Sequence, residues 1–146
     1  MLRAWMERVK PKSPWIPLLA ALVALAGCYW SRYPDLMETH LVLLEQYGAK
    51  LDSVARTERG VPMVDWAEFV YPLERAQDFA RIAARRYPDR SSLQQFRAVL
   101  ERYGALVDEP SFLARPDAIE RIESLRAALA EAIAGTRAEL EREAGA

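Results

Sequence analysis

The stretch Asp117–Leu140, DAIERIESLRAALAEAIAGTRAEL, decides the fold class. Its core-type residues recur at steps of three, four or seven positions, which places them on one face of a helix: Ile119, Ile122, Leu129, Ile133, Thr136 and Leu140, with Leu125 beside Arg126 in the longest gap. Asp117 and Glu120 have the spacing of an N-cap acceptor and its N3 glutamate, so the helix is expected to begin at Asp117. A helix with one apolar face must bury that face against other elements, which the rest of the chain has to supply.

Three earlier stretches carry the same two features. Asp35–Glu38, Asp65–Glu68 and Ser92–Gln95 repeat the capping-box spacing, and Asp89 is an equally good start for the third helix. Behind these starts run three stripes: Met37, Leu41, Leu44, Gly48, Leu51 and Ala55; Trp66, Phe69, Leu73, Ala76, Ala80, Ala83 and Tyr87; Leu93, Phe96, Leu100, Tyr103 and Val107. Between the stripes stand the breakers Gly60, Pro62, Pro88, Pro110 and Pro116. Pro72 predicts a kink or a late start in the second helix.

This pattern predicts an all-α domain, either a four-helix bundle or two packed αα-hairpins. LLEQYGAKLD (Leu43–Asp52) and VLERYGALVD (Val99–Asp108) share Leu, Glu, Tyr, Gly, Ala and Asp in register, which favours an internal duplication of one hairpin. The alternative is that helices rich in alanine and arginine look alike. Gly48 and Gly104 of the repeat are expected to allow close helix approach, with a C-cap as the other interpretation, above all for Gly104.

A rival architecture rests on AQDFARIAARRYP (Ala76–Pro88). This segment resembles the second helix of a tetratricopeptide repeat, because Ala76, Ala83 and Pro88 fall at matching places. The preceding segment lacks that family's Trp, Leu-Gly and Tyr pattern, and no repeat of roughly 34 residues follows. Tetratricopeptide-like helical hairpins are therefore the alternative to the bundle.

The first 28 residues carry a different pattern. The pattern begins with four basic residues, Arg3, Arg8, Lys10 and Lys12. The apolar segment Ile16–Ala24 follows them. A basic region, an apolar region and small residues at a cleavage point are typical of a secretory signal. Leu25-Ala26-Gly27-Cys28 resembles the lipobox of bacterial lipoproteins. The resemblance implies lipid attachment to the Cys28 thiolate, cleavage after Gly27 and acylation of the new amino terminus. An ordinary signal peptide, or an uncleaved anchor with an incidental cysteine, is the alternative.

The resemblance divides the chain into three parts: a cleaved signal peptide (residues 1–27), a lipidated cysteine with a short aromatic tether (residues 28–34) and a helical domain (residues 35–146). In enteric bacteria, Asp after the cysteine resembles an inner-membrane retention signal. Tyr29 stands there instead, so the expected location is the periplasmic face of the outer membrane. Tyr29, Trp30 and Tyr33 suit the headgroup region of a bilayer. The other interpretation is that these rings begin the core of the domain.

The sequence offers few groups for catalysis or metal binding. His40 is the only histidine and Cys28 the only cysteine, and no nucleophile-elbow or P-loop motif occurs. We therefore expect no enzyme and no cofactor, and a net charge of −1 gives no indication of nucleic-acid binding. Met37 and His40, three residues apart, are weak candidates for a copper site; the alternative is a surface His beside a core Met. Glu139 and Glu143 are expected on a solvated face with arginine partners.

Four arginines cluster near the end of the second predicted helix: Arg81, Arg85, Arg86 and Arg90. They are expected on a solvated face that favours a helix C-terminus, and the functional interpretation is a contact with lipid headgroups, a glycan or an acidic partner. The sequence as a whole predicts a membrane-anchored, periplasm-facing lipoprotein with a non-catalytic binding, scaffolding or assembly role. Its partners would be the membrane, through lipid on Cys28, and an envelope protein. A helical bundle that binds a small ligand or metal is the alternative, and an enzyme comes third.

Overall fold

Four helices make up most of the structure, a computed structural model that describes residues 32–56, 63–108 and 113–146. They are α3 (Tyr33–Ala55), α4 (Met63–Arg86), α5 (Ser91–Val107) and α6 (Ala118–Gly145). The described residues contain no strand. Met37–Ala146 forms one compact unit, and the first turn of α3 belongs to the unit that precedes it.

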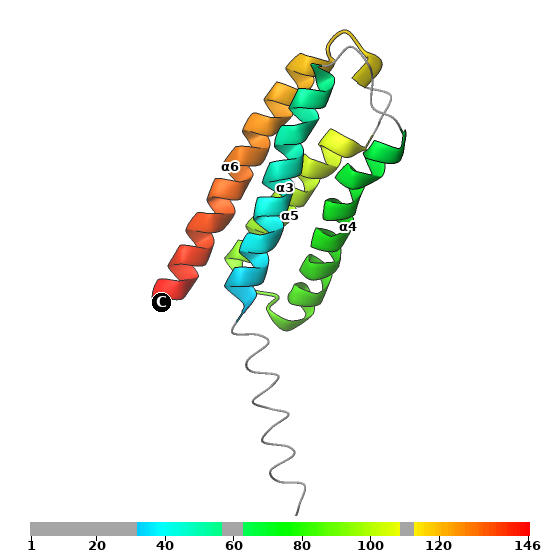
Figure 1. Cartoon of the computed structure of the whole chain (residues 1–146). Coiled ribbons are helices and arrows are strands. Elements are labelled where there is room, and N and C mark those ends of the chain that lie inside the picture. Colours follow the sequence, from blue (N-terminus) through cyan, green and yellow to red (C-terminus); the bar gives the residue numbers. More distant parts are fainter. Residues whose placement is uncertain (1–31, 57–62, 109–112) are drawn as a thin grey trace, which may run out of the picture. The chain divides into compact units, whose positions relative to one another are not determined.

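Within the unit from Met37 onward, the helices run alternately in opposite directions (Figure 1). Aromatic contacts join neighbouring helices: Tyr47 of α3 meets Phe69 of α4 at a centroid distance of 6.1 Å, and Phe79 of α4 meets Phe96 of α5 at 5.9 Å. Ion pairs join α6 to α3. The predicted four-helix bundle is confirmed, and the tetratricopeptide-like alternative is not the architecture observed.

The predicted stripes form the core with one clear exception. Met37, Leu44, Phe96 and Ile133 are each at most 1% exposed. Ile119 was expected to be buried, but it is 39% exposed, while the neighbouring Ala118 is 3% exposed. Counting back from Ile122 by four residues leads to Ala118 and by three to Ile119, and both steps fit a helical stripe. The sequence prediction chose Ile119, but Ala118 is the buried residue.

The predicted helix starts are less accurate than the stripes. The helix α3 begins at Tyr33, so Asp35 lies in its first turn rather than at the N-cap, and α4 begins at Met63, before Asp65. The N-cap of α5 is Arg90, not Ser92 or Asp89. Asp117 is the N-cap of α6, as predicted, but its ψ of 6° is not extended and its side chain makes no capping hydrogen bond. Its carboxylate accepts a hydrogen bond from Arg115 Nε at 3.2 Å instead.

Two predicted interruptions lie inside helices. Pro72 is in the interior of α4, so the late start predicted for that helix is wrong. Gly104 lies inside α5, whose C-cap is Asp108, so the C-cap interpretation of Gly104 is wrong as well.

The two glycines of the repeat each face a leucine of another hairpin. A Cβ on Gly48 would lie 2.9 Å from Leu129 Cδ2 of α6, and a Cβ on Gly104 would lie 3.9 Å from Leu73 Cδ2 of α4. The close approach predicted for Gly48 is therefore confirmed, whereas the spacing at Gly104 is that of ordinary contact. Gly48 and Gly104 are 56 residues apart, and so are Leu73 and Leu129. The two contacts are thus related by the same offset as the sequence repeat, which agrees with an internal duplication.

Candidate functional site

The arginines at the end of α4 do not form a single cluster. Arg81, Arg85 and Arg86 are exposed, and Arg81 pairs with Asp78 at 2.7 Å in a solvated ion pair of little energetic weight. Arg90 lies beyond the helix, at the N-cap of α5, with its guanidinium 4.7 Å from the centroid of the Tyr87 ring. The structure therefore brings three of the four predicted arginines together on α4 and places the fourth in a different network.

That network joins the start of α5 to the end of α6. Glu143 accepts hydrogen bonds from the Ser92 amide at 3.0 Å and the Ser92 hydroxyl at 2.7 Å, and its carboxylate lies 3.4 Å from Arg90 Nη1. The Ser91 hydroxyl donates to Glu139 at 2.8 Å. The Glu143 carboxylate therefore caps α5 from another helix, at a helix start where orphan amides favour negative charge.

The prediction of a solvated face for Glu139 and Glu143 is wrong. Their side chains are only 12% and 19% exposed, because both lie against the start of α5. Burial by itself would raise the pKa of Glu143, but hydrogen bonds from Ser92 and the charge of Arg90 outweigh it and lower that pKa. The network joins the start of α5 to the end of α6 through hydrogen bonds and an ion pair.

The end of the bundle that carries Arg85 and Arg86 is also the end at which α3 enters the unit at Met37 (Figure 1). This follows from the alternating directions of the helices, since α4 ends where α3 begins. The residues predicted to anchor the chain, Cys28, Tyr29 and Trp30, lie outside the described residues. Tyr33 is described and is 1% exposed.

Met37 and His40, the weak metal candidates, have different environments. Met37 is fully buried, whereas His40 is half-buried and stacks on Phe79 of α4 with 4.8 Å between ring centroids. Burial, together with the nearby charge of Arg75, lowers the pKa of His40. The Nδ1 atom of His40 is buried and has no hydrogen-bond partner among the described residues. Among the described residues, no group of three or more His, Cys, Asp or Glu side chains is placed to hold a metal ion.

Arg75 is held in place by an aromatic side chain. Its Nη1 donates to the Tyr71 hydroxyl at 2.8 Å, and its guanidinium lies 5.6 Å from the centroid of the same ring. In the parts of the chain that the structure describes, no carboxylate pairs with Arg75. Tyr71 is 56% exposed, so this pair forms a fixed cationic point on the surface.

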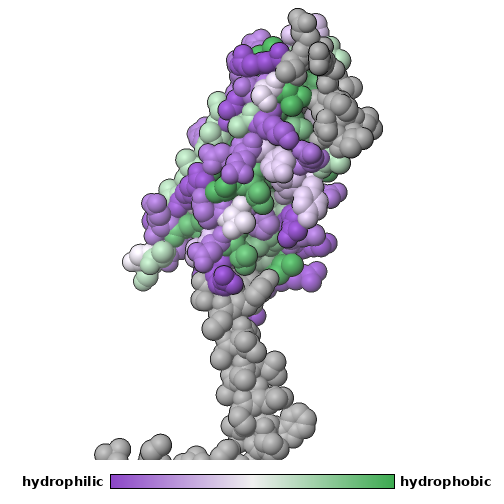
Figure 2. All heavy atoms as spheres, viewed as in Figure 1, coloured by the Kyte–Doolittle hydropathy of each residue, from purple (hydrophilic) through white to green (hydrophobic). Residues whose placement is uncertain are grey.

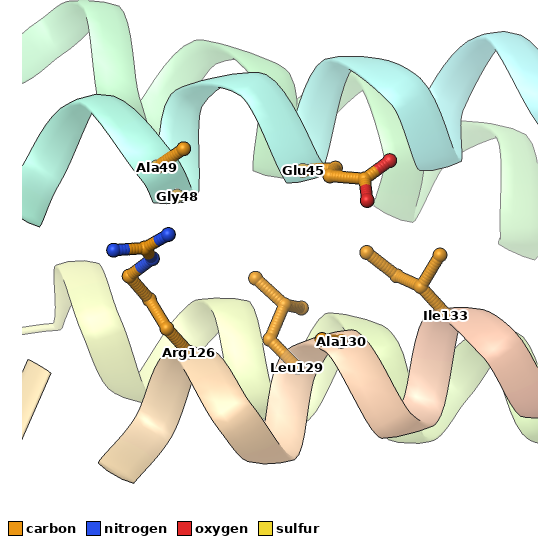
Figure 3. A pocket seen from close by; sticks show the side chains of 7 residues that line it. All are labelled: Glu45, Gly48, Ala49, Arg126, Leu129, Ala130 and Ile133. Carbon is orange, nitrogen blue, oxygen red and sulfur yellow. The ribbon is translucent and has the colours of Figure 1, made fainter. Parts of the chain in front are cut away.

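A small groove lies between α3 and α6. It has a volume of about 100 Å³ and is lined by Glu45, Gly48, Ala49, Arg126, Leu129, Ala130 and Ile133. Figure 3 shows Leu129 of α6 rising toward Gly48 of α3, with Arg126 and Glu45 on either side. Both charges already have partners: Arg126 pairs with Asp52 at 2.9 Å, and Glu45 pairs with Arg137 at 3.1 Å.

The same two helices are joined by ion pairs along their length. Arg137 binds Glu38 at 2.8 Å as well as Glu45, and Arg56 pairs with both Asp52 and Glu123. The hydrogen bond from Arg137 to Glu38 is the main cause that raises the pKa of Arg137. These partly exposed ion pairs are compatible with one register of α3 against α6 and contribute little energy each. Both charged residues that line the groove have a partner.

The comparisons with known proteins give no further guidance. No family model, no curated protein and no solved structure matches this chain. In the described parts of the chain, no helix is both long enough and apolar enough to cross a membrane.

Sequence reasoning missed Tyr71, Arg75 and Ile82. A signal was present, because Tyr71 and Ile82 are large apolar residues that lie off the predicted stripe of the second helix. An apolar residue off the stripe is expected at the surface, and the structure shows Tyr71 and Ile82 to be 56% and 53% exposed. The pairing of Arg75 with Tyr71 also has the helical i, i+4 spacing.

Proposed function

We propose that this chain is a lipoprotein of the bacterial envelope whose helical bundle faces the periplasm and has a non-catalytic binding, scaffolding or assembly role at the membrane. The lipobox-like Leu25–Cys28 supports lipid attachment at Cys28. Tyr29 after the cysteine favours the outer membrane over the inner one.

The observation that carries the proposal is the position of the last turn of α4, which contains Arg85 and Arg86 and is called the basic turn here. Arg85 and Arg86 are exposed at the end of the bundle where α3 enters at Met37, nine residues after Cys28 in the sequence. A lipid on Cys28 would keep that end near the bilayer. Anionic headgroups attract basic side chains close to their surface by about 1 kcal/mol each. An acyl chain combined with a basic patch anchors a protein more firmly than either does alone.

Mass spectrometry of the native protein tests the anchor. The expected product has lost residues 1–27 and carries acyl groups on Cys28. An intact Met1 or an unmodified Cys28 contradicts the proposal.

Vesicle binding tests the basic turn. Residues 32–146 should bind vesicles of phosphatidylglycerol, and Arg85→Gln with Arg86→Gln should weaken that binding about tenfold or more. Arg97 and Arg102 are exposed on α5, so the same double change there is the matched control. Equal loss in both double variants would mean that only net charge matters.

A second candidate is a bundle that binds a small ligand or a metal. It is favoured by two buried polar atoms that have no hydrogen-bond partner in the described residues, His40 Nδ1 and the Tyr103 hydroxyl. Calorimetric titration with Cu⁺ is the simplest test. Tight binding that is lost in both Met37→Leu and His40→Phe would favour this candidate, and heat changes that survive both substitutions would oppose it.

A further inference from the structure

A partly exposed apolar surface lies where α3 meets α4. His40, Leu43 and Tyr47 share one face of α3 and are half-buried, and the contacts of His40 with Phe79 and of Tyr47 with Phe69 turn that face toward α4. On α4, Tyr71 and Ile82 are more than half exposed. We name this surface the α3–α4 seam, consisting of His40, Leu43, Tyr47, Tyr71, Arg75 and Ile82. Figure 2 shows hydrophobic residues within the mainly hydrophilic surface over these two helices.

The other half of the bundle treats the equivalent positions differently. The offset of 56 residues relates His40, Leu43 and Tyr47 to Phe96, Val99 and Tyr103 of α5, and all three of these are fully buried. The same offset relates Tyr71 and Ile82 to the exposed alanines Ala127 and Ala138 of α6. One hairpin thus buries its core-type positions and has alanines on its outer face, whereas the other leaves those core-type positions half-buried and has Tyr71 and Ile82 exposed on its outer face. Exposed apolar groups gathered in one place are typical of an interaction surface.

The charge of the seam indicates what it would bind. Burial, together with the charge of Arg75, lowers the pKa of His40. Tyr71 holds the Arg75 guanidinium through one nitrogen, at 2.8 Å. The other edge of the guanidinium fork is available for a carboxylate, the anion that arginine binds in a bidentate manner. Along α4, steps of four and seven residues separate Tyr71, Arg75 and Ile82. Residues at these steps lie on one side of a helix, where a second helix can pack against them.

We propose that the α3–α4 seam binds an amphipathic helix of a partner protein, which places a carboxylate on Arg75 and apolar side chains against Tyr71, Ile82 and Leu43. The proposal deepens the binding role given above and rests on it, but it does not depend on the lipid anchor. Tyrosine and arginine surrounded by apolar contacts are also the residue types that dominate the energy of protein interfaces.

A partner helix fits the seam better than a membrane does. Tyr71 and Ile82 are separated by about 16 Å along α4, the length of three helical turns, and this line follows the side of the bundle rather than its basic end. Glu74 is exposed on the same helix and would be repelled by anionic headgroups, whereas Glu68 and Asp78 are paired with Lys50 and Arg81. The seam therefore offers one positive point in a mixed surface, which suits a carboxylate on a helix.

The test is photocrosslinking of the full chain in its native host. A benzophenone amino acid replaces Ile82 in one strain and Ala138, its counterpart in the repeat, in the other. We expect a protein adduct from position 82 and at least tenfold less from position 138. The crosslinked peptide should contain Asp or Glu among apolar residues at helical spacing. Arg75→Glu should reduce the adduct about tenfold or more, as removal of an interface anchor does, and Arg75→Lys should restore part of it. Glu131→Arg, at the counterpart of Arg75, is the matched control and should change nothing.

Each other result overturns the proposal. Lipid adducts from position 82 would assign the seam to the membrane, and equal adducts from positions 82 and 138 would show random collision. The absence of adducts from position 82, with the protein at its normal level, would show that the seam is unoccupied. Circular dichroism of the purified Arg75→Glu chain checks that the bundle is still folded. The mass of the mature amino terminus, measured in the same cells, tests the anchor separately, so that the two proposals can fail independently.

Discussion

Replacing Gly48 by alanine tests whether this glycine is required by the contact between α3 and α6. The new Cβ would lie 2.9 Å from Leu129 Cδ2. Carbon atoms in optimal contact lie about 3.5–4.0 Å apart, so Leu129 must leave its rotamer or the two helices must separate. Leu129 is 3% exposed, and the only space into which the far end of its side chain can turn, among the described residues, is the groove of about 100 Å³ that it lines with Gly48. Overpacking of this kind costs about 1–3 kcal/mol.

Helix propensity acts in the opposite direction. Alanine in a helix interior is about 0.8–1.0 kcal/mol more favourable than glycine. Gly48→Ala should therefore lie between neutral and about 2 kcal/mol less stable than the parent chain. Gly104 is the matched control, because its Cβ would meet Leu73 Cδ2 at the ordinary distance of 3.9 Å. Gly104→Ala should be up to about 1 kcal/mol more stable than the parent.

Urea unfolding followed by far-ultraviolet circular dichroism measures both variants, provided that the slopes agree. The decisive quantity is the difference between them, expected to be about 1–3 kcal/mol. Leu129→Val removes the Cδ2 atom, so the double variant with Gly48→Ala should show a favourable coupling energy. If Gly48→Ala is as stable as Gly104→Ala and no coupling is found, the close approach does not explain this glycine.

Three further predictions concern single side chains. Trp66 is 7% exposed, so Trp66→Ala should destabilise the domain by about 3–5 kcal/mol in urea unfolding; a loss below about 1 kcal/mol would place this ring on the surface. His40 has a pKa lowered from 6.5, so the unfolded chain binds its proton more readily, and stability should fall as the pH drops below 6.5. His40→Phe should remove that slope between pH 6.5 and about 5, where carboxylates begin to titrate, and a persistent slope would contradict the assignment. The pKa of Glu143 is lowered from 4.5, so the ionised carboxylate stabilises the fold above pH 4.5, and this stabilisation is lost as the pH falls through the pKa of the folded state. Glu143→Gln should make the free energy of unfolding less dependent on pH in that range, and it should lower amide-exchange protection at the start of α5.

The helices and most of the core could be predicted from the sequence because burial repeats with the period of the helix. The stripe of α5 is an example, since Leu93, Phe96, Leu100, Tyr103 and Val107 are all buried. The first residue of the same helix could not be predicted. Serine is a common N-cap residue, but the amide and the hydroxyl of Ser92 donate hydrogen bonds to Glu143, which lies 51 residues later in the sequence. A local capping rule assumes a local partner, and here the partner comes from another helix.

Contacts that depend on how far one helix is shifted along another could not be predicted from the sequence either. Arg137 and Glu38 are 99 residues apart, and their bidentate pairing requires that α3 and α6 stop sliding at one position. The stripes identify which faces meet but not how far one helix is shifted along the other. The close contact of Gly48 with Leu129 does fix that shift, because only one residue of α3 lets Leu129 approach so closely. The groove of Figure 3 follows from the same contact.

The repeat shows how one sequence pattern can serve two purposes in this bundle. Gly48 faces Leu129 and Gly104 faces Leu73, so each hairpin offers its glycine to the second helix of the other hairpin. A duplicated hairpin that packs against its own copy would make two such contacts in equivalent places. The two tyrosines that precede these glycines have diverged, because Tyr103 is fully buried and Tyr47 is half-buried on the α3–α4 seam. Tyr47 still packs against Phe69, but the part of its ring that stays exposed adds nothing to the packing of the bundle. The difference between the halves is therefore the observation on which the proposed partner site rests.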